Sequence, residues 1–143
     1  MERKSWIEDG YVLPVEGAKD GARDTVRRAW DTITESRIAY EEGDWERANE
    51  YLHAALYVAT EAFVRMHGCV PAYEYDFKLA KRLGRDLFSE RIVDPLFETV
   101  CVLGEMLPLE GPLSEEEDRT VRRSVSAGIE YVAMTEGLVL VRS

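Results

Sequence analysis

The sequence predicts an all-α protein, an up-and-down helical bundle of about five helices with short terminal extensions. Apolar residues recur three and four positions apart over long segments, and short connections of glycine, proline or aspartate join these segments. No segment alternates apolar and polar residues as a half-buried strand does. The 143 residues are 45% hydrophobic, which excludes a disordered chain and suits one domain. We therefore expect the bundle at residues 21–137, a lead-in at residues 1–20 and a tail at residues 138–143.

The lead-in, residues 1–20, is predicted to be irregular. Gly10, Pro14 and Gly17 interrupt it, and its charges follow no helical period. Its apolar residues are too numerous for a free tail, so we expect the segment to pack on the domain or on a neighbouring chain. They are Trp6, Ile7, Tyr11, Val12, Leu13 and Val15.

The clearest prediction is a hairpin of two antiparallel helices. The first helix is expected to run from residue 21 to residue 42 and to stop at Gly43, which permits a left-handed cap. Asp44 is the expected N-cap of the second helix, whose apolar positions continue to Met66. Because a glycine–aspartate connection leaves almost no loop, the two helices must fold back on each other.

Three further helices complete the predicted bundle. Pro71 suits the first turn of the third helix, and Asp94, which a proline follows, reads as the cap of the fourth. Ser114 and Glu117 match a capping box, which predicts the start of the last helix. That helix is expected to end at Gly137.

Charge and composition restrict the function. The net charge is −10 and the pI is near 4.7, which argues against general nucleic-acid binding; Arg119, Arg122 and Arg123, the one dense basic cluster, are expected to pair with the acidic residues before them. No uncharged apolar run approaches a membrane span, and the N-terminus lacks the apolar core of a secretion signal. We therefore expect no membrane partner and a cytoplasmic location. The absence of glutamine beside many glutamates and arginines is typical of a thermophile.

No metal or cofactor is expected. His53 and His67 are the only side chains that titrate near neutral pH without perturbation. Glu50 and His53 form the Glu-x-x-His pair of di-iron bundles, but the second pair that such a site needs is missing. Cys69 and Cys101 have no second ligand at metal-binding spacing, so they are read as buried thiols or, in a thermophile, as a disulfide.

Two sets of residues are candidates for a site. Arg47 and His53 carry the groups that RNA cleavage needs, but they lie on different faces of one helix and would have to converge across a second subunit. The alternative places His53 at the edge of the core and Arg47 in solvent. Tyr73 and Tyr75, together with His53, are candidates for a small-ligand site. A plain helix start capped by Asp76 is the more frequent explanation of such a cluster.

The hairpin and the segment after it resemble the HEPN-like superfamily of small helical bundles. The resemblance covers about 50 residues, from position 39 onward. It rests on a helix that ends in glycine–aspartate, an alanine-rich helix with an Ala-x-Glu step, and a glycine followed by a proline-containing loop. The matching residues are Gly43-Asp44, Ala48, Ala54, Ala55, Ala59-Thr60-Glu61, Gly68 and Pro71. The sequence YDFKLAKRLGRDLF, which comes next, resembles the third helix of the family.

The resemblance implies a bundle that often dimerises. Some HEPN-like proteins are ribonucleases with an arginine and, a few residues later, a histidine near the C-terminus; others partner a nucleotidyltransferase or bind a nucleotide. This chain has no histidine after His67. We therefore expect a non-catalytic association or nucleotide-related binding module, a homodimer, with a nucleotidyltransferase as a second candidate partner. The alternatives are a ribonuclease that uses Arg47 and His53 across a dimer and a bundle that binds a small ligand.

Overall fold

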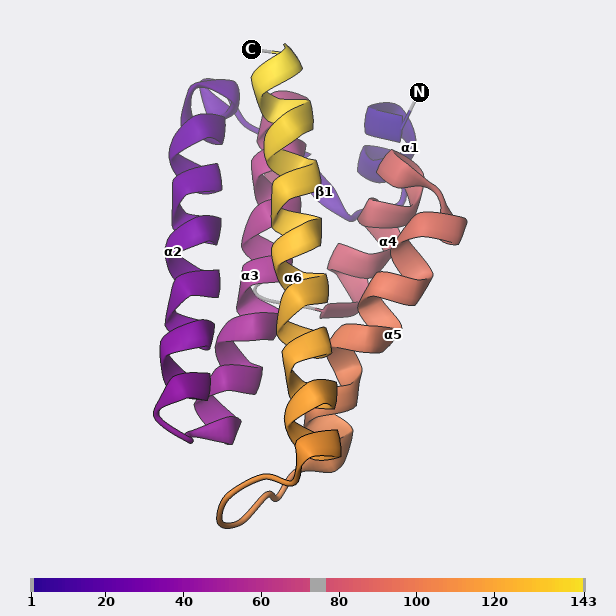
Figure 1. The fold of residues 1–143 in the computed structure, drawn as a ribbon. Helices are drawn as coiled ribbons and strands as arrows, with labels where there is room; N and C mark the ends of the chain where they lie inside the picture. The colour runs from indigo at the N-terminus through magenta and orange to yellow at the C-terminus, as the bar shows by residue number, and fades with distance from the viewer. Residues whose placement is uncertain (1, 73–76, 143) are drawn as a thin grey trace.

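The structure, a computed structural model, describes residues 2–72 and 77–142 and confirms the all-α bundle (Figure 1). Helices dominate these residues, and the one sheet found among them has two short strands. In chain order the elements are α1 (Glu2–Glu8), β1 (Val12–Pro14), the short 3₁₀ helix η1 (Ala18–Gly21), α2 (Ala22–Glu41), α3 (Trp45–Met66), β2 (Cys69–Pro71), α4 (Phe77–Phe88), α5 (Glu90–Met106) and α6 (Glu115–Arg142).

The predicted hairpin is present as α2 and α3. Gly43 has a φ of 75°, the left-handed conformation that glycine adopts without steric cost, and it ends α2. The Asp44 carboxylate accepts a hydrogen bond from the backbone N–H of Arg47 at 3.2 Å, as an N-cap does. Ser36 of α2 donates a hydrogen bond to the carbonyl of Ala48 at 2.7 Å and joins the two helices further along.

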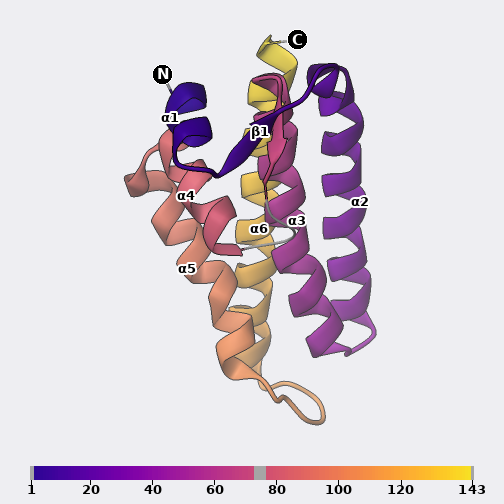
Figure 2. The same ribbon diagram turned by 180° about the vertical axis from the view of Figure 1, so that it is seen from behind.

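Helix α3 is the centre of the bundle. It packs against α2, α4, α5 and α6, and α6 in turn packs against α2 and α5. In Figure 1, α6 lies in front of α3 with α2 on one side and α5 on the other; Figure 2 shows α3 from the opposite side, near β1. The largest buried side chains come from nearly every element and include Trp6, Ile33, Leu52, Leu56, Phe63, Phe97 and Tyr131.

The N-terminal lead-in is ordered, so the prediction of an irregular segment at residues 1–20 was wrong. It forms α1, β1 and η1, and β1 pairs with β2 in antiparallel register, Leu13 opposite Val70. Of the two surfaces that the sequence left open, the segment packs on its own domain, because Trp6 is fully buried and its indole N–H donates to Asp86 of α4 at 2.8 Å. Strands of three residues are too short to show an alternating pattern.

The starts of α4 and α5 also differ from the prediction. Pro71 is the last residue of β2 rather than the start of a helix, because the chain first pairs with β1. Asp94 and its proline lie inside α5, which begins immediately after Ser89. The Asp94 carboxylate does not cap the helix; Arg85 of α4 donates two hydrogen bonds to it, at 2.7 and 3.0 Å. This pair fixes the tight corner between α4 and α5.

Helix α6 continues beyond its predicted end. The capping box is confirmed, since the Ser114 hydroxyl and the Glu117 carboxylate each accept from the other residue's backbone N–H, at 3.1 and 2.9 Å. Gly137, however, lies within the helix, and residues 138–142 are its last turns rather than a separate tail. The helix is continued by Val139, which is buried against Val26 of α2 in a second small core cluster.

Candidate functional site

Arg47 and His53 have separate environments on α3. Arg47 is exposed in the first turn; its Nη2 lies 3.4 Å from the Tyr51 hydroxyl and its guanidinium lies over the Tyr51 ring, 5.7 Å from the centroid. The hydrogen bond to Tyr51 raises the pKa of Arg47 further. His53 is half-buried and stacks on Phe77 of α4, with ring centroids 4.6 Å apart. Within one chain, then, the described contacts place Arg47 in solvent and His53 against α4, as the non-catalytic alternative expects.

The other two candidate residues, Tyr73 and Tyr75, lie outside the described residues, as does the predicted cap Asp76. Phe77, the first residue after this segment, is the residue that contacts His53. The small-ligand site at His53 therefore stays a prediction.

A second polar group accompanies His53 on α3. Asn49 stands one helical turn earlier on the same face, beside Gly104 of α5: a Cβ at Gly104 would lie 3.3 Å from the Asn49 side-chain amide, so the missing Cβ makes room for it. The Asn49 Oδ1 and the His53 Nε2 are both buried and have no hydrogen-bond partner among the described residues. Such atoms are uncommon in folded proteins. The sequence gives no signal for this pair beyond the rarity of asparagine.

Burial lowers the pKa of His53 below its ordinary value of 6.5. The unfolded chain therefore binds more protons than the folded chain between these two pKa values, and stability rises with pH across that window. We expect the free energy of unfolding to fall as the pH is lowered from about 6.5, by at most about 1.4 kcal/mol per pH unit for this one group. Urea denaturation between pH 7 and pH 5 measures this slope.

The variant His53→Phe isolates the contribution of the imidazole, because phenylalanine keeps a ring on Phe77 and cannot be protonated. The carboxylates of the chain contribute equally to both proteins. The wild-type protein should therefore lose more stability than His53→Phe on acidification, and parallel curves for the two proteins would contradict the assignment.

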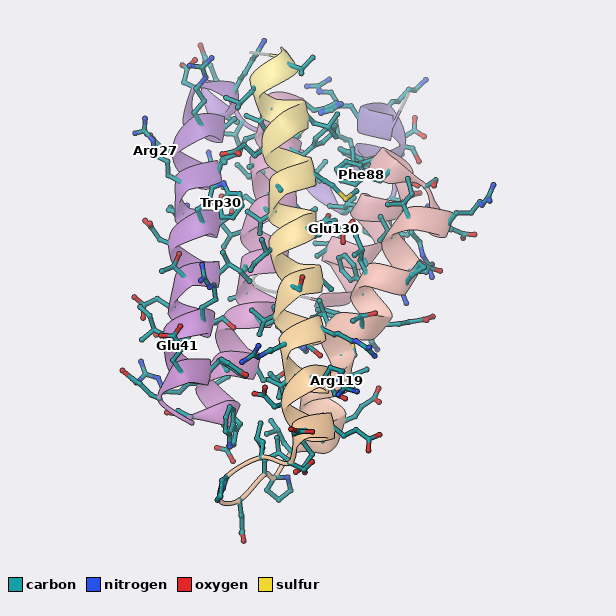
Figure 3. All side chains as sticks on the ribbon, in the orientation of Figure 1. Arg27, Trp30, Glu41, Phe88, Arg119 and Glu130 are labelled. Atoms are coloured by element: carbon teal, nitrogen blue, oxygen red, sulfur yellow. The ribbon has the colours of Figure 1, made fainter. Side chains whose placement is uncertain are left out.

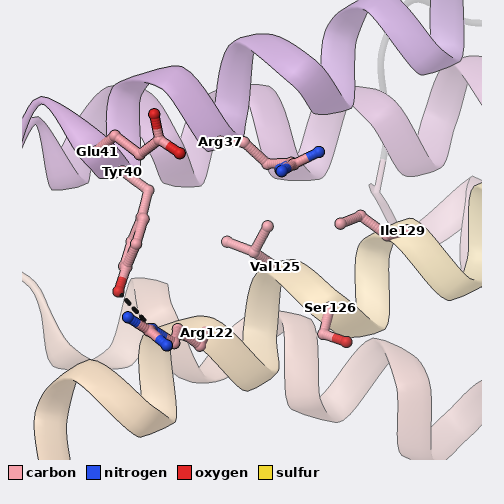
Figure 4. Close-up of a pocket in the computed structure, with 7 residues that line it drawn as sticks. All are labelled: Arg37, Tyr40, Glu41, Arg122, Val125, Ser126 and Ile129. Carbon is pink, nitrogen blue, oxygen red and sulfur yellow. Dashed lines mark hydrogen bonds between the residues drawn. The ribbon is translucent and has the colours of Figure 1, made fainter. Parts of the chain in front are cut away.

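A concave site that the sequence analysis missed lies between α2 and α6 (Figure 4). This α2–α6 groove has a volume of about 280 Å³ and is lined by Arg37, Tyr40, Glu41, Arg122, Val125, Ser126 and Ile129. Its residues lie far apart in the sequence, and only the packing of α6 on α2 brings them together. No local sequence motif predicts this groove.

One end of the groove is held by a hydrogen-bond network across the two helices. The Tyr40 hydroxyl donates to Asp118, and the Arg122 Nε donates to the Tyr40 hydroxyl at 3.0 Å. The same Nε lies 3.0 Å from the Asp118 carboxylate, so the predicted pairing of the basic cluster with preceding acidic residues is confirmed for Arg122. Burial and the Asp118 carboxylate raise the pKa of Tyr40; the Tyr40 hydroxyl and the Asp118 charge raise the pKa of Arg122. The tyrosine is thus neutral and the arginine charged at neutral pH.

The solvent-facing side of α6 forms a second unusual surface, which we call the outer face of α6. It consists of the exposed residues Arg119, Arg122, Arg123, Ser126, Glu130, Ala133, Gly137, Leu140 and Val141. Among the residues just named, Glu130 is the one charged residue beyond Ser126, and Leu140 and Val141 are 55% and 85% exposed. In Figure 3, Glu130 lies on the side of α6 away from α2, whereas Trp30 of α2 lies between the two helices and donates to Glu136 at 2.8 Å.

By length and composition alone, α6 is apolar enough to cross a membrane. An 18-residue window within Glu115–Val141 has a mean hydropathy of 1.3, and 44% of this window is buried inside the bundle. The apolar residues of α6 thus serve partly as core and partly as exposed surface. The expectation that the protein has no membrane partner stays a prediction.

No group of three or more histidine, cysteine, aspartate or glutamate side chains suited to a metal ion occurs in residues 2–72 and 77–142. Both cysteines are free: Cys69 is buried and Cys101 is partly exposed. The disulfide that the sequence left open is therefore not formed. Burial, with Glu105 nearby, raises the pKa of the Cys101 thiol and keeps it protonated.

The fold and these surfaces define an all-α helical bundle with a groove between α2 and α6 and an exposed face on α6. No protein-family model, no curated protein and no solved structure matches the chain.

Proposed function

We propose that this chain is a non-catalytic helical bundle that acts by association, as a HEPN-like module, and that it forms a homodimer. The observation that carries the proposal is the outer face of α6, which runs the length of the longest helix, ends in the exposed Leu140 and Val141, and has one acidic residue beyond Ser126. Soluble proteins seldom leave such a face uncovered without a use for it.

The charges on this face favour a second copy of the chain as the occupant. Arg123 and Glu130 are exposed, stand seven residues apart and therefore share one edge of the helix. Neither forms an ion pair with another described residue. If two copies of α6 cross antiparallel about a two-fold axis near residues 126–127, Arg123 of each copy meets Glu130 of the other. The interface then gains two equivalent ion pairs, and Ser126 near the axis allows the helices to approach closely.

The environments of the candidate catalytic residues support a non-catalytic role. The His53 imidazole has a buried Nε2 and a ring covered by Phe77, whereas a general acid or base must reach the proton that it transfers. The Arg47 guanidinium is engaged with Tyr51. Within the described residues of one chain, Arg47 and His53 do not contact each other, so the ribonuclease alternative gains no support there. The nucleotidyltransferase and nucleotide partners stay predictions.

Charge reversal at the proposed interface tests the homodimer. We expect the wild-type protein to sediment as a dimer at micromolar concentration. In Arg123→Glu, residues 123 and 130 that meet across the interface are both negative, and in Glu130→Arg they are both positive. Each variant should therefore weaken dimerisation about tenfold or more. The double variant Arg123→Glu/Glu130→Arg restores opposite charges and should recover most of the affinity. Analytical ultracentrifugation over a concentration series measures all four proteins.

Arg91→Glu is the matched control. Arg91 is exposed on α5, away from the outer face of α6, and its replacement changes the net charge by the same amount. It should dimerise like the wild type. A monomeric wild type at tens of micromolar, or a double variant as weak as the single variants, would overturn the proposal.

A further inference from the structure

We infer that the α2–α6 groove is a binding site for an organic phosphate, a phosphate monoester with an apolar body. Three side chains that carry hydrogen-bond donors line the groove from two helices: Arg37 of α2, and Arg122 and Ser126 of α6 (Figure 4). Guanidinium groups bind phosphate oxygens through two parallel N–H donors, which makes paired arginines suited to this anion.

Both arginines have donors to spare. Arg37 forms no ion pair with another described residue, and its side chain extends from α2 along the groove. Arg122 uses its Nε for Tyr40 and Asp118, while its two Nη groups have no hydrogen-bond partner in residues 2–72 and 77–142. The Tyr40 network therefore fixes the arginine in place and leaves its outer N–H groups available for a ligand.

The floor of the groove explains why the ligand carries an apolar body. Val125 of α6 lies in the middle of the groove and Ile129 at the end away from Tyr40; both belong to or pack against the hydrophobic core, so their surfaces are held rigidly (Figure 4). The volume of about 280 Å³ is near the lower end of the roughly 300–1,000 Å³ range of small-molecule sites. Inorganic phosphate would leave most of this space and the apolar floor unused.

Glu41, which lies beside Tyr40 on α2, is a carboxylate in the lining of the groove that takes no part in the Tyr40–Arg122–Asp118 hydrogen-bond network (Figure 4). Asp118 is paired with Arg122, so Glu41 and Asp118 together balance the two guanidinium groups, and the groove is close to neutral on a chain whose net charge is −10. A dianionic phosphate gains more from two cations than a carboxylate does, whereas Glu41 opposes it. This balance makes a test of sign possible, because removal of a groove cation and removal of Glu41 should have opposite effects.

Phenyl phosphate is the probe, titrated into the full-length protein and followed by the amide chemical shifts of α2 and α6. We expect saturable binding with a dissociation constant below about 1 mM, with the shifts concentrated around Val125 and Ser126. Arg37→Gln and Arg122→Gln should each weaken binding about tenfold, and Glu41→Gln should tighten it by about twofold to fivefold. Inorganic phosphate, which lacks the ring, and benzoate, which lacks the second charge, should both bind more weakly than phenyl phosphate.

Arg91→Gln removes an exposed arginine from α5 and should leave the affinity unchanged. If Arg91→Gln and Arg37→Gln weakened the binding of phenyl phosphate equally, the effect would come from net charge alone and the inference would be overturned. An affinity unchanged by both Arg37→Gln and Arg122→Gln would also overturn it. Equal affinity for inorganic phosphate and phenyl phosphate would overturn the role of the apolar floor. Arg37 forms no ion pair within the described residues, so a weakened Arg37→Gln variant with an unchanged thermal midpoint has lost binding rather than fold.

The groove shares Arg122 and Ser126 with the outer face of α6, so variants of α2 are the ones that separate this site from the homodimer. Arg37 and Glu41 belong to α2 and lie outside the outer face of α6, so Arg37→Gln should bind phenyl phosphate weakly and still dimerise. Conversely, Arg123→Glu should dimerise weakly and bind phenyl phosphate as a monomer. Each result can fail without the other.

Discussion

Replacing Trp6 with alanine should lower the free energy of unfolding by about 3–5 kcal/mol, the cost that is typical of deleting a buried tryptophan. The indole is fully buried although it lies only a few residues from the N-terminus, and its ring contacts that of His67 at a centroid distance of 5.4 Å. Its N–H donates to Asp86 of α4. Alanine would remove the apolar contact and leave part of the Asp86 carboxylate without its partner. Urea denaturation at pH 7 measures the loss.

Trp6→Phe separates the two contributions, because phenylalanine keeps an aromatic ring and loses the N–H donor. We expect this variant to lose about 1.5–3 kcal/mol, the value of one hydrogen bond to a charged group. A loss below about 1 kcal/mol for Trp6→Ala would mean that α1 is not part of the cooperative fold.

Replacing Gly128 with alanine should destabilise the protein by about 1–3 kcal/mol, although alanine is the better helix former. Gly128 lies where α6 crosses α2 and α3. A Cβ at this position would overlap the Cδ1 of Leu52 and would lie 3.1 Å from the Cδ1 of Ile33. Both of those side chains are buried in the core, so neither can move aside without strain.

Gly137 provides the matched control on the same helix. A Cβ there would have no atom within 4 Å, so Gly137→Ala should gain helix propensity, about 0.5–1 kcal/mol, with no clash. The same substitution nine positions apart is thus expected to have opposite signs. If Gly128→Ala proved as stable as Gly137→Ala, the close packing of α6 on Leu52 would be contradicted.

The parts of the fold that the sequence predicts are those coded by neighbouring residues. The corner at Gly43 and Asp44 and the capping box at Ser114 and Glu117 are confirmed because their hydrogen bonds join residues three positions apart or less. The predictions that were wrong concern segments whose structure depends on a contact with a residue elsewhere in the fold. Trp6 becomes ordered because α4 supplies Asp86, eighty residues away.

The same distinction explains the errors at Asp94 and Gly137. Asp94 reads as a cap in isolation, but Arg85 of the preceding helix binds its carboxylate and places it inside α5. Gly137 predicts the end of the helix, but Val139 packs in a buried cluster with residues of α2 and α3, and this contact stabilises the helix beyond Gly137. In both cases the free energy of a tertiary contact exceeds the small local preference of one residue.

The candidate site was the least predictable part. Sequence reasoning selected Arg47 and His53 by residue type, and the structure places one on Tyr51 and the other on Phe77. It did not select the α2–α6 groove, because Arg37 and Arg122 lie far apart in the sequence. They line one groove only because α6 packs on α2. Tyr40, whose hydroxyl accepts from Arg122 and donates to Asp118, gave no sign of this role in the sequence.

By itself, the sequence determined the class of the protein, the hairpin of α2 and α3 and the start of α6, because apolar period, glycine and capping side chains act over one or two turns. The tertiary structure alone decided which polar groups are buried, which helix face is left uncovered and where a groove opens. Those features depend on the relative placement of helices, and that placement is set by the fit of side chains such as Leu52 against Gly128, which no local pattern records.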